Sequence, residues 1–81
     1  MKIKYFAWIK EITNKDYEII ESNFPEDISA LKLKLIKSYP DLKKHIDSDV
    51  MRFAVNLEYT SVNLKLSSSD EIGIFPPVSG G

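Results

Sequence analysis

The sequence contains no cysteine, and it has no apolar run long enough to cross a membrane. Without cysteine there is no disulfide, no thiol nucleophile and no thiolate ligand for a metal. The chain begins with alternating polar and apolar residues where a signal peptide carries an apolar block, so we expect a cytoplasmic protein with no membrane partner. The net charge of −1 comes from 11 basic and 12 acidic residues, and this balance gives no attraction to nucleic acid.

The residues that most metal and cofactor sites need are also missing. The one histidine, His45, has no second histidine or cysteine to complete a zinc site, and we expect it to be a solvated surface residue. Asp47 and Asp49 lack the glycine and closing glutamate of a calcium loop. No phosphate-binding loop or dinucleotide fingerprint is present. We therefore expect no bound metal or cofactor, and in a chain of 81 residues with a thin core the function should lie on the surface or at a terminus.

Alternating apolar residues predict several short strands around one helix. Residues 28–39 also fit a strand, because leucine and lysine alternate there, but we predict a helix that Asp27 caps and Pro40 ends. On this helix, the lysines expected to face solvent are Lys32, Lys34 and Lys37. Short helical turns are expected at residues 9–13 and 41–46. The predicted strands cover residues 2–8, 17–21, 52–56, 59–62 and 71–75.

The order of these elements predicts an α+β protein with the β-grasp (ubiquitin-like) fold. In this fold a mixed sheet of four to five strands carries one main helix on one face, and the first and last strands pair in parallel in the middle. We assign residues 1–75 to the β-grasp domain and residues 76–81 to an extended C-terminal tail.

The strand period of two also predicts which side chains face inward. Phe6 and Phe75 then point outward, and if their strands are neighbours, the two rings share one side of the sheet as a docking patch. Gly73 would keep the surface between them open, and Tyr59 is a third candidate member. The alternative is that these are scattered surface residues, which are common. The residues predicted to face inward are Ile3, Tyr5, Phe53, Val55, Ile72 and Ile74.

The C-terminal tail carries the clearest chemical signal. Pro76 and Pro77 cannot continue a sheet ladder and favour a stiff extended path. Gly80 and Gly81 have no side chains, so this end of the chain can enter a narrow channel. A terminal carboxylate is a poor acyl donor and must be activated, commonly as an acyl-adenylate made from ATP. The alternative is a frayed terminus that happens to contain glycine.

Several short motifs are shared with a known family. They are Tyr5-Phe6-Ala7 followed by Lys10-Glu11, Ala54-Val55-Asn56, Asp70-Glu71-Ile72 and above all Phe75-Pro76-Pro77-Val78-Ser79-Gly80-Gly81. With these motifs the chain resembles, over its whole length, the small subunit of molybdopterin synthase, the MoaD family of sulfur carriers.

This resemblance implies a pathway, the biosynthesis of the molybdenum cofactor. An E1-like (MoeB-like) enzyme would adenylate Gly81 with ATP and magnesium, and sulfur transfer would give a thiocarboxylate. The loaded tail would enter the large subunit (MoaE-like), which uses the sulfur to build the molybdopterin dithiolene. The assembly would be a heterotetramer of two small and two large subunits, in which this chain donates sulfur but is not catalytic alone.

The resemblance also implies which residues act. Gly81 and Gly80 would form the reactive end, and Phe6 and Phe75 match docking aromatics of the family, whereas Tyr59 stands where an aliphatic residue is common. Three other functions remain open. The chain could be a sulfur carrier for another pathway, such as thiamine, a tungsten-pterin or another metabolite. It could also be a ubiquitin-like protein modifier or a non-covalent interaction module. The implied docking residues are Phe6, Tyr59, Phe75, Pro76, Pro77, Val78 and Ser79.

Overall fold

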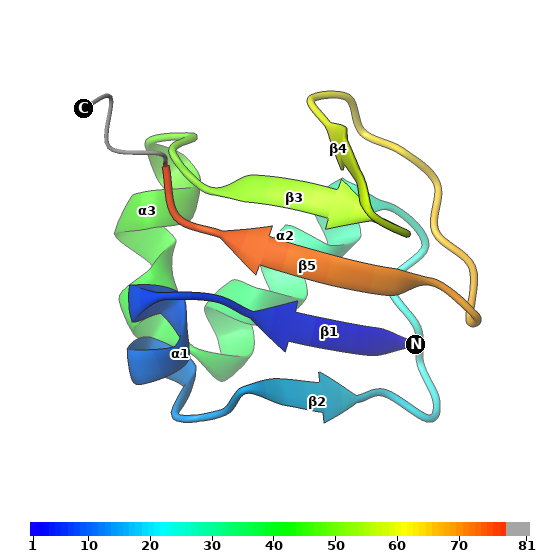
Figure 1. Cartoon of the computed structure of the whole chain (residues 1–81), viewed down its shortest axis with the longest axis horizontal. Helices are drawn as coiled ribbons and strands as arrows, with labels where there is room; N and C mark the ends of the chain where they lie inside the picture. Colours follow the sequence, from blue (N-terminus) through cyan, green and yellow to red (C-terminus); the bar gives the residue numbers. More distant parts are fainter. Residues whose placement is uncertain (78–81) are drawn as a thin grey trace.

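One mixed sheet with helices on a single face makes up the fold in the computed structural model, which describes residues 1–77 (Figure 1). The strand order is β2-β1-β5-β3-β4; β1 and β5 pair in parallel at the centre, and the other neighbours are antiparallel. The strands are β1 (Lys2–Tyr5), β2 (Tyr17–Ile19), β3 (Arg52–Val55), β4 (Glu58–Thr60) and β5 (Glu71–Phe75). The helices are α1 (Trp8–Thr13), α2 (Ile28–Ser38), the 3-10 turn η1 (Pro40–Leu42) and α3 (Lys43–Asp47). The predicted β-grasp fold is confirmed.

Helix α2 forms as predicted and covers the inner face of the sheet. The Asp27 carboxylate accepts a hydrogen bond from the Ala30 N–H at 2.8 Å, which caps the first turn. Ile28, Leu31 and Leu35 are buried along one side of the helix. None of the helices within residues 1–77 is long and apolar enough to cross a membrane.

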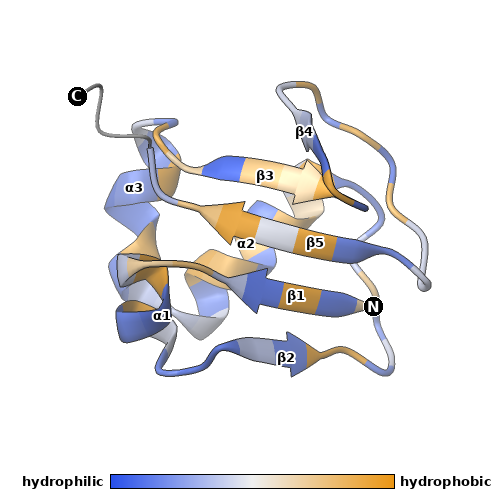
Figure 2. Ribbon diagram, viewed as in Figure 1, coloured by the Kyte–Doolittle hydropathy of each residue, from blue (hydrophilic) through white to orange (hydrophobic). Residues whose placement is uncertain are grey.

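The inner face of the sheet is the wall of the hydrophobic core. Along β1 and β5 apolar residues alternate with polar or small ones (Figure 2), and the apolar set packs under the helices. All six residues predicted to face inward are buried, which confirms the strand parity. These residues are Ile3, Tyr5, Phe53, Val55, Ile72 and Ile74.

Strand β1 ends at Tyr5, so the predicted extension to residue 8 is wrong. Ala7 has φ 53° and ψ −134°, and the Ile9 N–H donates to the Phe6 carbonyl at 3.1 Å. These features define a type II′ turn, which takes the chain out of the sheet. The Phe6 N–H still donates to the Ile74 carbonyl at 3.1 Å, so Phe6 remains fixed to β5.

Strand β4 lies slightly earlier than the predicted 59–62. Asn56 and Leu57 have φ values of 50° and 72° and form a tight hairpin turn, so pairing with β3 resumes at Glu58. After Thr60 the chain turns away, and the Thr60 hydroxyl accepts the Val62 N–H at 3.2 Å. Strand β2 is also shorter than the predicted 17–21.

Two side chains predicted to be solvated are packed instead. The ring of His45 lies 4.6 Å from the Trp8 ring, because α3 lies beside α1. The ammonium of Lys32 lies 5.6 Å from the centre of the Phe53 ring and 3.9 Å from Asp49. The predicted helical turn at residues 41–46 is the 3-10 turn η1 followed by α3.

Candidate functional site

Three aromatic rings meet on the outer face of the sheet, opposite α2. Phe6 follows β1, Phe75 ends β5 and Tyr59 lies on β4. The rings of Phe6 and Phe75 are stacked at 4.3 Å with 5° between their planes, and Tyr59 lies 5.5 Å from Phe75. We call Phe6, Tyr59 and Phe75 the outer cluster. The structure thus brings together the three aromatic residues that the sequence suggested.

Two small residues allow these rings to lie flat on the sheet. Gly73 pairs with Lys4 of β1 and Ala54 of β3, and Ala54 pairs in turn with Tyr59. A Cβ atom on Gly73 would lie 2.8 Å from Cε1 of Phe75 and 3.3 Å from Cε2 of Phe6. The expectation that Gly73 keeps the surface open is therefore wrong, because the two rings fill the space above it.

The outer cluster remains in contact with water. Tyr59 is 69% exposed and Phe6 is 36% exposed, whereas Phe75 between them is half-buried. Water contact with clustered aromatic rings is unfavourable, and such patches on small proteins typically mark binding surfaces. The cluster can therefore gain free energy from a partner that covers it.

A groove of about 720 Å³ runs from the outer cluster to the start of the tail. Pro76 and Pro77 line it together with Phe6 and Phe75, so the tail leaves the domain from the patch itself. The other lining residues are Ala7, Arg52, Tyr59, Thr60 and Ser61. The remaining predicted tail residues, Val78, Ser79, Gly80 and Gly81, lie outside the described residues.

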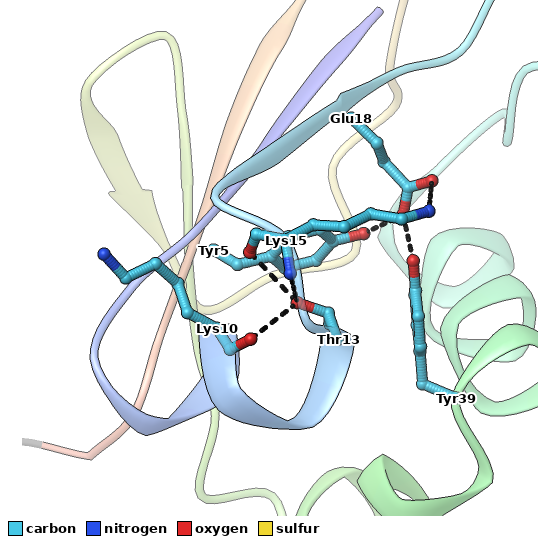
Figure 3. Close-up of polar contacts among 6 residues, drawn as sticks. All are labelled: Tyr5, Lys10, Thr13, Lys15, Glu18 and Tyr39. Atoms are coloured by element: carbon cyan, nitrogen blue, oxygen red, sulfur yellow. Dashed lines mark hydrogen bonds and ion pairs between the residues drawn. The ribbon is translucent and has the colours of Figure 1, made fainter.

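The opposite face of β1 carries a second aromatic cluster, which the sequence analysis missed. Tyr5 and Tyr39 meet edge to face at 6.0 Å, and both hydroxyls donate to Oε1 of Glu18, from Tyr39 at 2.8 Å (Figure 3). The Lys15 ammonium reaches Oε2 of Glu18 at 3.4 Å. We call Tyr5, Tyr39 and Glu18 the inner cluster. The sequence does contain one indication of this cluster: Glu18 pairs with the inward-facing Ile3 across β1 and β2, so its side chain also faces inward.

Within the inner cluster, the pKa of Tyr5 is raised and the pKa of Glu18 is lowered. Burial and the hydrogen bond to Glu18 raise the pKa of the Tyr5 hydroxyl, which stays protonated. Burial alone would raise the pKa of Glu18, but hydrogen bonds from Tyr5 and Tyr39 and the charge of Lys15 lower it overall. In the inner cluster two phenol hydroxyls thus donate to one carboxylate on the inner side of β1.

Comparison with known proteins assigns this domain to a family. The family model described as ThiS family matches residues 3–81. The chain is 39% identical to the molybdopterin synthase sulfur carrier subunit of Dictyostelium discoideum, over 99% of this chain and 94% of that protein. It is 35% identical to the human protein of the same name, over 100% of this chain and 93% of that protein.

Solved structures share the fold. A putative molybdopterin converting factor subunit 1 from Pyrococcus furiosus matches with a TM-score of 0.79 and 29% identity, over 95% of each chain. Small archaeal modifier protein 1 from Methanosarcina acetivorans has the same TM-score of 0.79 and 29% identity, over 99% of this chain and 94% of that chain. A chain from the complex of subunits 1 and 2 of the Helicobacter pylori molybdopterin-converting factor matches with a TM-score of 0.68 and 26% identity, over 99% of this chain and 96% of that chain.

Proposed function

The chain belongs to the ThiS family, and we propose that within this family it is the sulfur carrier subunit of a molybdopterin synthase. The observation that carries the proposal is the position of Pro76 and Pro77, the first two residues of the tail. Pro76 and Pro77 line the same groove as the outer cluster, so a subunit that covers the rings also receives the end of the chain. The names of the full-length relatives in Dictyostelium and human support the same function.

The chemistry takes place at the carboxylate of Gly81. In an E1-like (MoeB-like) activating enzyme that uses ATP and magnesium, this carboxylate attacks the α-phosphorus of ATP and releases pyrophosphate. Sulfide from the sulfur donor then adds to the acyl carbon, the C–O bond to AMP breaks, and loss of the sulfur-bound proton leaves a thiocarboxylate. Gly80 and Gly81 suit this step because a channel closed around the backbone has no room for a Cβ atom.

The loaded tail then delivers its sulfur to a large subunit (MoaE-like). In this proposal Phe6, Tyr59 and Phe75 dock on the large subunit, and Pro76 and Pro77 hold the tail extended toward its active site. The residues that would lie in the channel are Val78, Ser79, Gly80 and Gly81. There the sulfur becomes part of the molybdopterin dithiolene, in a heterotetramer of two small and two large subunits. The Helicobacter complex of subunits 1 and 2 supports a large-subunit partner.

Mass spectrometry of the intact protein tests this chemistry. We incubate the chain with its activating enzyme, ATP, magnesium and a sulfur donor, and expect the mass change of one oxygen replaced by sulfur at Gly81. Deleting Gly81, or adding one residue after it, should abolish loading and leave the fold intact. The matched control adds the same residue before Met1 and should load normally. Loading of the C-terminally extended chain would contradict the proposal.

A second function, as a ubiquitin-like protein modifier, is favoured by one observation. The fold and 29% of the sequence match the small archaeal modifier protein 1 of Methanosarcina acetivorans. In this role the activated Gly81 would form an isopeptide bond with a lysine of a target protein. Peptide mapping of cell extracts should then find target lysines that carry the C-terminal residues of this chain. Loading without any such conjugate would favour the carrier function alone.

A further inference from the structure

Arg52 lies inside the groove, beside the outer cluster. In the pairing of β3 with β5, Arg52 stands directly opposite Phe75. The next residue, Phe53, is buried on the inner face, so the alternation of β3 turns Arg52 to the outer face. Arg52 lines the groove together with Tyr59 and Pro76. A partner surface that fills the groove therefore contacts the Arg52 side chain as well.

The charge of Arg52 has no ionic partner among residues 1–77. Its guanidinium donates one hydrogen bond, from Nη1 to the backbone carbonyl of Asp49 at 3.3 Å, and it forms none of the ion pairs of the described residues. Lys4, on the same face of the sheet, is paired with Glu71 at 3.0 Å. Among the described residues that line the groove, Arg52 alone carries a formal charge.

An unpaired guanidinium at the centre of an interface is unfavourable. Removing the guanidinium from water carries a desolvation penalty, which an acceptor of opposite charge on the partner offsets. The planar fork of arginine fits a carboxylate through two parallel hydrogen bonds. A partner with an Asp or Glu side chain at this position is therefore favoured, and one with a lysine or an apolar residue there is disfavoured.

We propose that Arg52 is a specificity-determining residue of the docking surface, which pairs with a carboxylate of the large subunit beside the Phe75 ring. The inference rests on the proposed function and adds the chemistry of the partner to it. The aromatic rings supply apolar contact that many surfaces can match. Arg52 adds a charge that only a complementary surface satisfies, and it does so where the tail leaves the domain.

Binding of the whole chain to the large subunit of the same organism tests the proposal. We expect Arg52→Gln to weaken binding about 30-fold, mainly through faster dissociation, as for a charge pair covered by an interface. Arg52→Glu should weaken it further, because two carboxylates would then face each other. The thermal stability of both variants should equal that of the unmodified chain, since Arg52 is exposed. The matched control is Lys37→Gln, which removes one positive charge from an exposed position on α2 and should bind normally.

A cross-link identifies the partner carboxylate. Arg52→Lys keeps the charge and places an amine in the groove, so a carbodiimide should join residue 52 to an acidic side chain of the large subunit. Peptide mapping of the cross-linked product then identifies that acidic residue. Changing it to lysine should weaken binding to the unmodified chain and restore binding to the Arg52→Glu variant.

The possible outcomes separate this inference from the proposed function. If the unmodified chain does not bind the large subunit, the proposed function fails and the inference fails with it. If the unmodified chain binds and Arg52→Gln binds equally well, the inference alone is wrong. An effect under about threefold that lies only in the association rate also overturns it, because that behaviour belongs to a solvated charge at the rim.

Discussion

Tyr5 and Phe6 are neighbours in the chain, but they belong to two aromatic clusters on opposite faces of the sheet. In the inner cluster, Tyr5 is 1% exposed and its hydroxyl donates to Glu18, which also accepts from Tyr39. In the outer cluster, Phe6 is 36% exposed and stacks on Phe75. The inner cluster has a polar partner for each buried hydroxyl, whereas the outer cluster presents bare rings to water.

This difference teaches how so small a domain separates stability from binding. The inner cluster satisfies its polar groups within the domain, so it contributes to folding and has nothing left to offer a partner. The outer cluster leaves apolar area uncovered, so part of its free energy is released only when a partner binds. The predictions below test this division, beginning with the largest effect.

Alanine substitutions at the two neighbouring positions should have opposite results. Tyr5→Ala removes a buried ring and leaves Glu18 with one phenol partner, so we expect a loss of about 4 kcal/mol in the free energy of unfolding. Phe6→Ala should cost less than about 1 kcal/mol of stability but about 2 kcal/mol of binding to the large subunit. Chemical denaturation and titration calorimetry measure the two quantities.

The control for this pair is Tyr5→Phe, which keeps the inner ring and removes only its hydroxyl. It should lie between the unmodified chain and Tyr5→Ala in stability and should bind normally. If Phe6→Ala lost as much stability as binding, Phe6 would be a core residue, and the separation of the two clusters would be wrong.

Glu18→Gln tests the polar side of the inner cluster. Hydrogen bonds to a charged group typically contribute more than neutral ones, so we expect a loss of about 2 kcal/mol in stability at neutral pH. The pKa of Glu18 is lower in the folded chain than in the unfolded one. Its stabilising contribution is therefore complete above the unfolded pKa of about 4.3 and is lost as the pH falls through the lower, folded pKa.

The pH dependence of unfolding provides the measurement. Between about pH 5 and pH 3 the unmodified chain should lose stability more steeply than Glu18→Gln. Some acid sensitivity should persist in the variant, because hydrogen bonds from the Ser67 backbone N–H and the Asn56 side chain also lower the pKa of Asp70. Binding of the large subunit at neutral pH should not change. Identical acid profiles for both chains would show that Glu18 carries no ionic role in folding.

Local patterns predicted most of the fold and part of the site. Period-two alternation predicted the six inward-facing residues and the outward direction of Phe6 and Phe75. Asp27 and Pro40 marked the two ends of helix α2. Each of these signals involves residues that are close together in the chain, so it can be interpreted without knowledge of the tertiary structure.

The contacts that sequence reasoning missed depend on register between distant segments. Tyr39 reaches Glu18 across 21 positions of sequence, and no local pattern links an inward glutamate on β2 to the residue after α2. Arg52 enters the groove only because β3 pairs with β5 in one register. A slip of one residue in β2 or β3 would move the side chain of Glu18 or Arg52 to the other face of the sheet.

Gly73→Ala sharpens the account of the outer cluster. The new Cβ atom would lie 2.8 Å from Cε1 of Phe75, so the ring must tilt away from its stacked position on Phe6. We expect a loss of about 1 kcal/mol in stability, at the low end for overpacking because a ring edge can move, and weaker binding of the large subunit. Combined with Phe75→Ala, the substitution should cost almost nothing more, since the ring it displaces is gone. Additive effects of the two substitutions would contradict this account.

Ala7→Gly should have the smallest effect and the opposite sign. Ala7 occupies the first central position of a type II′ turn at φ 53° and ψ −134°, where glycine is strongly preferred. Relief of backbone strain, less the entropy that glycine loses on folding, should raise the free energy of unfolding by roughly 0.5 kcal/mol.

The control for Ala7→Gly is Asn14→Gly. Asn14 also has a positive φ, of 60°, but asparagine tolerates the left-handed conformation, so this change should be close to neutral. If Ala7→Gly lowered the free energy of unfolding by as much as an alanine-to-glycine change within a strand, Ala7 would not be in a strained turn. A gain at Ala7 alone, measured by chemical denaturation, would show that the chain accepts strain beside Phe6, where the turn sets the position of the ring and the edge of the groove.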